Sequence, residues 1–362
     1  MPAIISVPFL LAIIAIGAAV AVALLLLTAL VRIGRYLLVR FRRRLEDQVR
    51  PLVLQAVMGE GVPDEAVAAR GLRGRAVERV AFGYLAQVRG EGHDLLADLL
   101  QRRGVLARAV GRSYWPSRHQ RSAAASQLGL IATAEAARRL EFLAASDPSP
   151  QVRIVAARGL GKTSEPAAAD TLLSLLPGGT VPAGIVASAL LELGPEAAPA
   201  LRHTLAAEPD HGPERAMAAD VLGLLDEMTA CPELVSCLSS SGPQVRLAAA
   251  RALGRLGMPQ ATEALLRCLA PAEEPGVRAA AAWALGRILD RRAVSALSAC
   301  LDDPHYWVAH NAAQALAQLG APGREALTAA ASGGGPGAPH AREALSRPLR
   351  TGRPLLPGGI AP

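Results

Sequence analysis

The chain is poor in aromatic residues and nearly devoid of lysine. Aromatics make up 3% of its 362 residues against 51% hydrophobic residues, so the apolar content is mainly alanine, leucine and valine. Small and straight-chain side chains of this kind suit close helix–helix packing. Lys162 is the single lysine, so arginine carries nearly all of the positive charge. No stretch alternates apolar and polar residues with a period of two, and we therefore expect an all-α fold.

Recognisable catalytic motifs are also missing. The sequence contains no HExxH, GxSxG or phosphate-binding-loop pattern, and its seven histidines are scattered. We therefore expect no catalytic residues, no cofactor and no resident metal, and a protein that is not an enzyme.

The net charge of +7 is concentrated in one segment. Residues 32–50 carry seven arginines against Glu46 and Asp47, whereas the rest of the chain is nearly neutral. A nucleic-acid-binding protein needs a basic surface on its folded domain. The local distribution of charge therefore disfavours nucleic acid as a partner.

The longest apolar run precedes those arginines. Residues 3–31 hold no charged side chain. About 20 apolar residues in a helix cross the hydrocarbon core of a bilayer, so we expect a transmembrane anchor in residues 1–31 whose core is residues 9–31. A cleaved signal peptide is the alternative, but such peptides have a basic start and an apolar core of only about 7–15 residues.

Basic residues lie only on the C-terminal side of this run. Those nearest to it are Arg32, Arg35, Arg40, Arg42, Arg43 and Arg44. The positive-inside rule then predicts a single-pass protein of the cell membrane, with its N-terminus outside and residues 32–362 in the cytoplasm. These arginines could also bind anionic lipid headgroups, or they could only set the topology.

The remaining organisation follows from proline, glycine and helical patterns. Residues 32–62 are expected to form a basic juxtamembrane segment and linker, in which Pro51 breaks the helix. Residues 63–116 resume helical patterns and are expected to cap the N-terminal end of a repeat array. Residues 332–362 are rich in glycine and proline, and we expect a flexible tail there, with one helical turn at residues 340–346.

The middle of the chain is built from an internal repeat. Seven leucines, each preceded three residues earlier by an alanine, recur at intervals of 30 to 32 residues: Leu128, Leu160, Leu190, Leu222, Leu253, Leu285 and Leu316. A fixed period in this range is typical of an array in which each unit buries its apolar face against its neighbours.

Each repeat reads as a pair of helices. In residues 244–270, for example, two apolar stripes at helical spacing are separated by Gly257, Met258 and Pro259. Three units read DPSPQVRIVAARGLG, SGPQVRLAAARALG and EPGVRAAAAWALG. These segments resemble the HEAT-repeat family in its short bacterial form, related to the repeats of phycobilin lyases. The resemblance covers residues 117–331 and implies an α-solenoid of about seven HEAT-like helix pairs.

An arginine recurs with the repeat, at Arg121, Arg153, Arg215, Arg246 and Arg278. The resemblance implies that it is structural and pairs with acidic residues in the turns, such as Asp147, Glu274 and Asp303. A row of arginines that binds nucleic-acid phosphates is the alternative. The third unit has Pro182 and Ala183 where Val-Arg is expected, and the last has Ala309 in the arginine position, so weaker contacts are expected there.

The cysteines also follow the repeat. Cys237, Cys268 and Cys300 each lie 15 residues after a repeat leucine. Equivalent positions in stacked helix pairs lie about 8–10 Å apart, which is too far for a disulfide or a shared zinc ion. A bridge from Cys231 to Cys237 is open, but reduced cysteines that pack in the core agree better with a cytoplasmic domain.

One segment gathers aromatic and polar residues that the repeat does not require. Trp307 aligns with positions that look exposed, Gln151 and Gln244, and exposed aromatics often anchor partner contacts. The candidate partner-binding residues are Trp283, His305, Tyr306, Trp307, His310 and Asn311. The alternative is that they cap the last repeat or pack under the C-terminal tail.

These observations predict a membrane-anchored scaffold that binds other proteins along its solenoid and holds them at the cytoplasmic face of the membrane. The resemblance to phycobilin lyases implies an alternative, an enzyme or enzyme subunit. A helical-repeat protein that binds nucleic acid is a further alternative.

Overall fold

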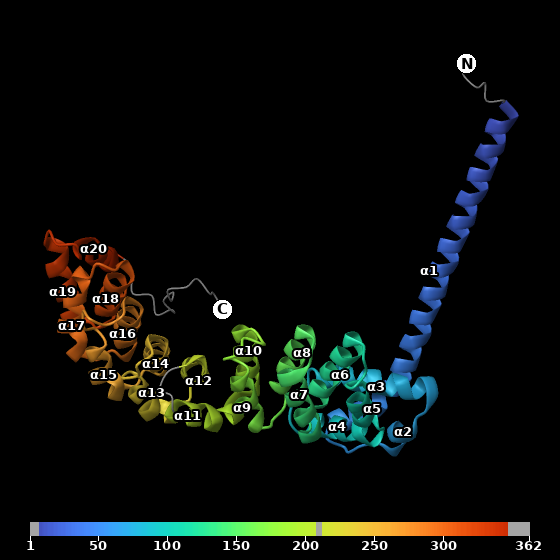
Figure 1. Ribbon diagram of the computed structural model, residues 1–362, viewed down its shortest axis with the longest axis horizontal. Coiled ribbons are helices and arrows are strands. Elements are labelled where there is room, and N and C mark those ends of the chain that lie inside the picture. Colours follow the sequence, from blue (N-terminus) through green and yellow to red (C-terminus); the bar gives the residue numbers. More distant parts are fainter. Residues whose placement is uncertain (1–6, 208–211, 347–362) are drawn as a thin grey trace. The chain divides into compact units, whose positions relative to one another are not determined.

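The computed structural model describes residues 7–207 and 212–346, with side chains from residue 24 onward. All regular structure in these residues is helical, and they contain no strand. The chain divides into two compact units, residues 1–108 and residues 109–362. Figure 1 shows the helices in chain order.

The first unit consists of one long helix and several short ones. They are α1 (Val7–Val57), α2 (Asp64–Ala68), α3 (Gly71–Leu85) and α4 (Glu91–Arg102), followed by α5 (Val105–Arg112), which continues into the second unit. Near its end α1 buries Val49, Val53 and Ala56 and packs against α3 and α4. The small core of this unit therefore surrounds the last turns of α1.

The prediction that Pro51 breaks the helix is wrong. Pro51 lies inside α1, which continues to Val57. Proline removes one backbone hydrogen bond and disfavours a helix interior, but here the buried face formed by Val49, Val53 and Ala56 runs through this position. Tertiary packing thus outweighs the local preference, and the helix ends just before Gly59, whose φ is +80°.

The predicted membrane span coincides only partly with the described residues. Residues 9–31 lie within α1, but the side chains of residues 9–23 are outside the described part of the chain. Among the residues that the structure describes, no helix has the length and apolar character needed to cross a membrane. The described part of α1 does expose large apolar side chains, among them Leu25, Leu26 and Leu30.

The second unit is a solenoid of seven helix pairs within the described residues. The first helices of the pairs are α6 (Arg118–Ile131), α8 (Pro150–Leu160), α10 (Ala183–Leu193), α12 (Pro213–Leu224), α14 (Pro243–Leu256), α16 (Pro275–Ile288) and α18 (Tyr306–Gln318). Each of the first six packs against the first helix of the next pair. The all-helical solenoid is therefore as predicted.

The second helices are shorter. They are α7 (Ala134–Ser146), α9 (Ala167–Ser174), α11 (Ala198–Ala206), α13 (Cys231–Cys237), α15 (Thr262–Arg267), α17 (Val294–Ala299) and α19 (Ala321–Ser332). Short 3₁₀ turns lead into or follow several of them: η1 (Gly194–Ala197), η2 (Met228–Ala230), η3 (Pro259–Ala261), η4 (Arg291–Ala293) and η5 (Cys300–Asp302).

The repeat leucines form the core of the second unit. All seven have no exposed surface, and so have six of the seven alanines that precede them by three residues. The exception is Ala187 of α10, which is half-buried. It belongs to the third unit, in which Pro182 and Ala183 replace the usual Val-Arg.

Close contact between successive first helices depends on glycine. A Cβ atom added to Gly254 of α14 would lie 2.8 Å from the Cα of Ala284 on α16 and 2.5 Å from Trp283 Cζ3. A Cβ on Gly286 of α16 would lie 2.7 Å from the Cα of Ala315 on α18. In both cases the glycine follows a repeat leucine and the alanine precedes the next repeat leucine. The Leu-Gly pair therefore occurs where the backbones of two successive first helices come close together.

The C-terminal segment differs from the flexible tail predicted for residues 332–362. It contains α20 (Ala338–Ser346), which packs against α18 and α19 and buries Ala338, Ala341 and Ala344. Three alanines at helical spacing give this helix a narrow apolar face that the glycine- and proline-rich composition concealed. Residues 347–362 of the predicted tail lie outside the described residues.

Candidate functional site

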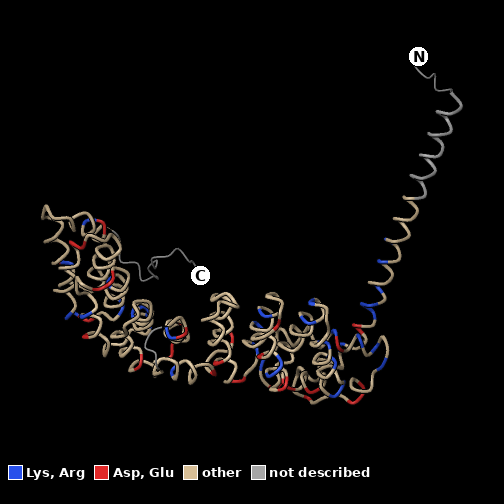
Figure 2. The backbone as a smooth tube through the Cα atoms, viewed as in Figure 1, with Lys and Arg blue, Asp and Glu red and all other residues tan. Residues whose placement is uncertain are grey.

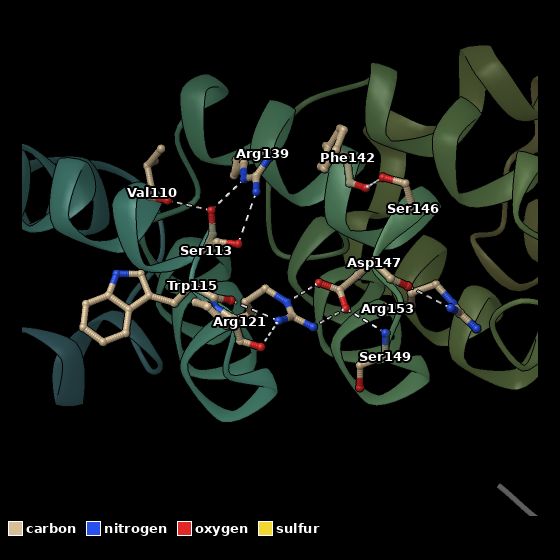
Figure 3. Close-up of polar contacts among 11 residues, drawn as sticks. Val110, Ser113, Trp115, Arg121, Arg139, Phe142, Ser146, Asp147, Ser149 and Arg153 are labelled. Atoms are coloured by element: carbon tan, nitrogen blue, oxygen red, sulfur yellow. Dashed lines mark hydrogen bonds and ion pairs between the residues drawn. The ribbon is translucent and has the colours of Figure 1, made fainter.

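The recurring arginines connect neighbouring repeats. Arg121 at the start of α6 donates from Nε to Asp147 Oδ2 at 2.7 Å and from Nη2 to Asp147 Oδ1 at 3.0 Å, in the turn before α8. Its Nη1 also donates to the backbone carbonyls of Trp115 and Pro116. Figure 3 shows this arrangement, in which one guanidinium joins the turn that precedes its own helix to the next turn of the array.

Two further arginines repeat the pattern. Arg278 donates from Nε to Asp303 Oδ2 at 2.9 Å, and it also donates to the carbonyl of Glu273. Arg246 donates from Nη2 to Glu273 Oε1 at 2.6 Å. The expected acidic partner was Glu274, so the sequence interpretation was off by one residue, because Glu274 is the N-cap residue of α16.

The other two arginines of the row use carbonyl acceptors. Arg153 donates to the carbonyls of Asp147 and Thr180, and Arg215 donates to the carbonyl of Ala207. The next turn after Arg153 thus provides a carbonyl oxygen, whereas Arg121, Arg246 and Arg278 each have a carboxylate in the next turn.

We call the five recurring arginines and their acceptors the ladder. The ladder lowers the pKa values of its acidic members. Burial by itself would raise the pKa of Asp147, but the hydrogen bonds from Arg121 and from the Ser149 amide outweigh it, and the pKa lies below its ordinary value. The pKa values of Glu273 and Asp303 are lowered in the same way, by Arg246 and Arg278 acting against burial. These carboxylates are therefore ionised and paired at neutral pH.

Charge along the second unit is mixed in sign. Figure 2 shows Asp and Glu interspersed with Arg throughout the solenoid, whereas the arginines that end the apolar stretch of α1 form a row. That row includes the six candidate lipid-binding arginines, which lie on a helix with exposed apolar side chains between them, such as Tyr36, Leu38 and Phe41.

The structure brings together three of the six candidate partner-binding residues. Tyr306, Trp307 and His310 lie on the first two turns of α18. The Tyr306 and His310 rings stack with centroids 5.5 Å apart and an interplanar angle of 14°. Trp307 meets both rings edge to face. Tyr306 and Trp307 are 54% and 45% exposed, and we call these two residues the last-repeat aromatic surface.

The other three candidates have contacts within the array. Asn311 is buried and donates from Nδ2 to the carbonyl of Ala279 on α16 at 2.9 Å. His305, the N-cap residue of α18, lies with Nδ1 3.2 Å from Arg278 Nη2 and 3.3 Å from Asp303 Oδ1. Trp283 on α16 is half-buried and lies over Gly254 of α14. Asn311 and His305 thus belong to the junction between the sixth and seventh pairs, and Trp283 to the junction between the fifth and sixth.

A histidine and a glutamate of α20 complete the cluster on α18. The His340 ring lies 5.2 Å from the Tyr306 ring and 6.4 Å from the His310 ring. Glu343 Oε2 lies 3.7 Å from His310 Nδ1. The group His310, His340 and Glu343 could hold a metal ion, since one ligand atom of each lies within 4.8 Å of the others. Sequence reasoning missed it because it treated residues 332–362 as a tail.

A second exposed aromatic surface lies in the first repeat. Tyr114 and Phe142 are 67% and 56% exposed, and we call these two residues the first-repeat aromatic surface. Trp115 is 54% exposed, and its ring lies apart from Phe142. The Arg139 guanidinium lies 3.8 Å from the Tyr114 ring centroid and 4.7 Å from that of Phe142. It also donates from Nε to Ser113 Oγ at 2.6 Å (Figure 3). The tyrosine and tryptophan were visible in the sequence, but the approach of Phe142 from α7 was not.

The four cysteines are buried, and none of them forms a disulfide. Burial is the main cause that raises the pKa values of Cys268 and Cys300 to about 11. At neutral pH they are therefore protonated thiols, a form that neither binds metal nor attacks electrophiles readily.

Comparison with known families identifies the repeat. HEAT repeats match residues 116–190, 198–274 and 268–345, which together make up more than half of the chain. The chain therefore belongs to the HEAT-repeat family. No curated protein sequence matches it.

Several solved structures are similar in fold. Human deoxyhypusine hydroxylase in complex with glycerol is 22% identical, with 76% of this chain and 97% of that chain covered and a TM-score of 0.31. The CpcE–CpcF complex of phycocyanin lyase from Nostoc sp. PCC7120 is also 22% identical, with coverages of 62% and 92% and a TM-score of 0.31. Kap121p bound to Pho4p is 14% identical with a TM-score of 0.48, and the match covers 77% of this chain but only 38% of that one.

Proposed function

We propose that the protein is a membrane-anchored scaffold, a binding rather than a catalytic protein, whose solenoid holds a partner protein at the cytoplasmic face of the membrane. The observation that carries the proposal is the last-repeat aromatic surface. In a chain with 3% aromatic residues, Tyr306 and Trp307 lie side by side on α18 and remain about half exposed. Aromatic side chains contribute strongly to protein–protein binding because they bury large areas at a small entropic cost.

The charges of the solenoid favour a protein partner over a nucleic acid. The guanidinium groups of Arg121, Arg246 and Arg278 already form ion pairs with carboxylates of the array. Phosphate binding would require them to give up partly buried ion pairs, and acidic residues lie between the arginines along the unit.

The membrane anchor is supported by the sequence and by the exposed part of α1. Residues 3–31 carry no charge, and the six arginines follow directly. In water the exposed leucines of α1 would remain uncovered, whereas a bilayer would bury them at about 25 cal/mol per Å² of apolar surface. We propose that residues 9–31 cross the bilayer with the N-terminus outside, and that Arg32, Arg35, Arg40, Arg42, Arg43 and Arg44 lie at anionic headgroups on the cytoplasmic side.

Site-specific photocrosslinking tests the proposed binding surface. The photoreactive residue p-benzoylphenylalanine would replace Trp307 or, in a second protein, Trp115, with the full chain expressed in its membrane. Matched control positions are Leu224 and Met228, which are also exposed but lie in the middle of the array. We expect a discrete crosslinked product from Trp307 that the control positions do not give. Equal crosslinking from Leu224 and Met228 would contradict the proposal.

Fractionation tests the anchor separately. The full chain is expected in the membrane fraction after alkaline carbonate washing, and a chain lacking residues 3–31 is expected in the soluble fraction. Protease added from outside to intact cells should leave residues 32–362 uncut. Release of the full chain by carbonate would refute the span, and digestion of the solenoid from outside would refute its orientation.

A further inference from the structure

Helices α18 and α20, which pack against each other, bring three potential metal ligands to one place. His310 lies on α18, and His340 and Glu343 lie on α20. His340 and Glu343 are three residues apart on a helix and therefore share a face. The ligand atoms of the three side chains lie within 4.8 Å of one another, and His310 Nδ1 lies 3.7 Å from Glu343 Oε2.

These separations suit a small ion with nitrogen and oxygen ligands. Ligand atoms bound at about 2.0–2.1 Å to a tetrahedral zinc ion lie about 3.3 Å apart. The separation of His310 from Glu343 exceeds that value by a few tenths of an ångström. The other separations are no more than 4.8 Å, so the binding of one ion by all three groups requires side-chain rotations.

The position of α20 is fixed by contacts other than these three residues. The Gly337 amide donates to Asp302 Oδ1 at 2.9 Å, which ties the start of α20 to η5. Ala338, Ala341 and Ala344 are buried beneath the helix. The rotation of α20 about its axis is thereby set, and with it the direction of His340 and Glu343 toward α18.

Aromatic rings hold the two imidazoles in place. Tyr306 stacks on His310 and meets His340 edge to face, with centroids 5.5 and 5.2 Å apart. Trp307 meets His310 edge to face at 5.9 Å. All three potential ligands are half-buried, which leaves one side open to water.

We propose that His310, His340 and Glu343 form a binding site for a divalent transition metal ion of the zinc type, with water in the remaining coordination position. Two imidazoles and one carboxylate are a ligand set that zinc uses with water in the fourth position. Magnesium and calcium prefer sites made entirely of oxygen ligands, and copper(I) prefers sulfur. The bound ion would join α20 to α18 and so close the C-terminal end of the array. This inference is independent of the membrane anchor and of the partner.

Zinc titration of the full chain tests the site. The tag-free protein, freed of metal with a chelator, would be titrated with Zn²⁺ in competition with a chromophoric chelator. The cluster variants are Glu343→Gln, which keeps the side-chain shape, and His340→Asn. Matched controls are His119→Ala and His203→Ala, which remove exposed histidines elsewhere in the same unit.

We expect one zinc ion per wild-type chain and an affinity that is lower by about tenfold or more in both cluster variants. We expect the controls to match the wild type, and zinc to slow amide exchange in residues 338–346 of the wild type only. Helical content and the melting temperature of the metal-free variants would show that they remain folded. Absence of zinc binding in the wild type, or a zinc affinity of Glu343→Gln and His340→Asn that equals the wild-type affinity, would overturn the proposal.

Discussion

Arg121 illustrates how single residues hold the repeats together. Its guanidinium bonds to a carboxylate in the next turn and to two carbonyls in the turn before its own helix. The Arg121 and Asp147 side chains are 12% and 2% exposed, so the ion pair is largely withdrawn from water. Removal of one partner from such a pair leaves a buried charge uncompensated, which costs far more than the loss of a surface pair.

Replacement of Asp147 should therefore destabilise the solenoid. We expect Asp147→Asn to lower the free energy of unfolding of the second unit by about 3 kcal/mol, because Arg121 stays charged and loses its partner. Urea unfolding followed by circular dichroism measures the change. The control is Glu263→Gln, which breaks the exposed pair with Arg292 and should leave the midpoint close to that of the wild type. Equal effects of the two substitutions would contradict a structural role for the ladder.

The lowered pKa values of Asp147, Glu273 and Asp303 predict a dependence of stability on pH. A carboxyl group whose pKa is lower in the folded than in the unfolded chain stabilises the fold fully above its unfolded value of about 4. That stabilisation is lost as the pH falls through the lower, folded value. We expect the melting temperature to drop below about pH 4 in the wild type and to drop less steeply in Asp147→Asn. Parallel curves would show that this carboxylate does not contribute.

The buried cysteines should be inert in the folded protein. Since burial raises the pKa values of Cys268 and Cys300 to about 11, almost no thiolate is present at pH 8. We expect Ellman's reagent to react with none of the four thiols rapidly in the native chain and with all four in guanidinium chloride. Rapid native reaction of Cys268 or Cys300 would contradict their placement in the core.

At the scale of the helices, the repeat is defined by close approach of successive first helices. Gly254 and Gly286 each follow a repeat leucine and face an alanine of the next first helix. Ridges and grooves of small residues let the backbones come together, and the repeat leucines then fill the core on the other side of the contact. The stability of a junction between two repeats thus depends on residues that contribute little apolar area themselves.

A methyl group at one of these contacts should therefore be costly. We expect Gly254→Ala to destabilise the second unit by about 1–3 kcal/mol through overpacking against Trp283 and Ala284. The matched control is Gly184→Ala, since Gly184 lies in α10 with no atom within 4 Å of an added Cβ. That substitution should be neutral or stabilising because alanine favours the helix. Thermal unfolding of both proteins measures the difference, and a stable Gly254→Ala protein would refute the close packing.

Periodicity in the sequence was sufficient to predict this architecture. The leucine period predicted the core and the helix pairs, because in a solenoid each unit contacts only its neighbours and the same positions face inward in every repeat. The sequence interpretation was wrong to place a helix break at Pro51 and a tail at the position of α20. At both places packing, rather than composition, decides whether a helix forms. Val49 and Ala56 carry α1 through the proline, and three alanines anchor α20.

The candidate site was predictable only in part. Trp307 aligns with exposed repeat positions, and its exposure follows from the alignment alone. The approach of His340 and Glu343 to His310 requires the path of the chain from α19 into α20, which no local pattern contains. For the same reason Phe142 could not be assigned to the surface formed with Tyr114.

At the scale of the whole molecule, the family and the surface chemistry favour a scaffold. The ladder arginines and the cysteines have structural roles within the array. Among the described residues of the second unit, two exposed aromatic surfaces remain, one in the first repeat and one in the last. Together with an uncharged segment of membrane-spanning length at residues 3–31, they support our proposal of a partner protein held near a bilayer.

Distribution of the crosslinked partner between membrane and soluble fractions tests this account most directly. The partner identified from Trp307 would be quantified in cells that express the full chain, the chain lacking residues 3–31, or the Trp307→Ala chain, with Leu224→Ala as the control. We predict that the partner is found with membranes only when the full chain or the Leu224→Ala chain is present. A partner that stays at the membrane with both the shortened chain and Trp307→Ala would contradict the proposed scaffold.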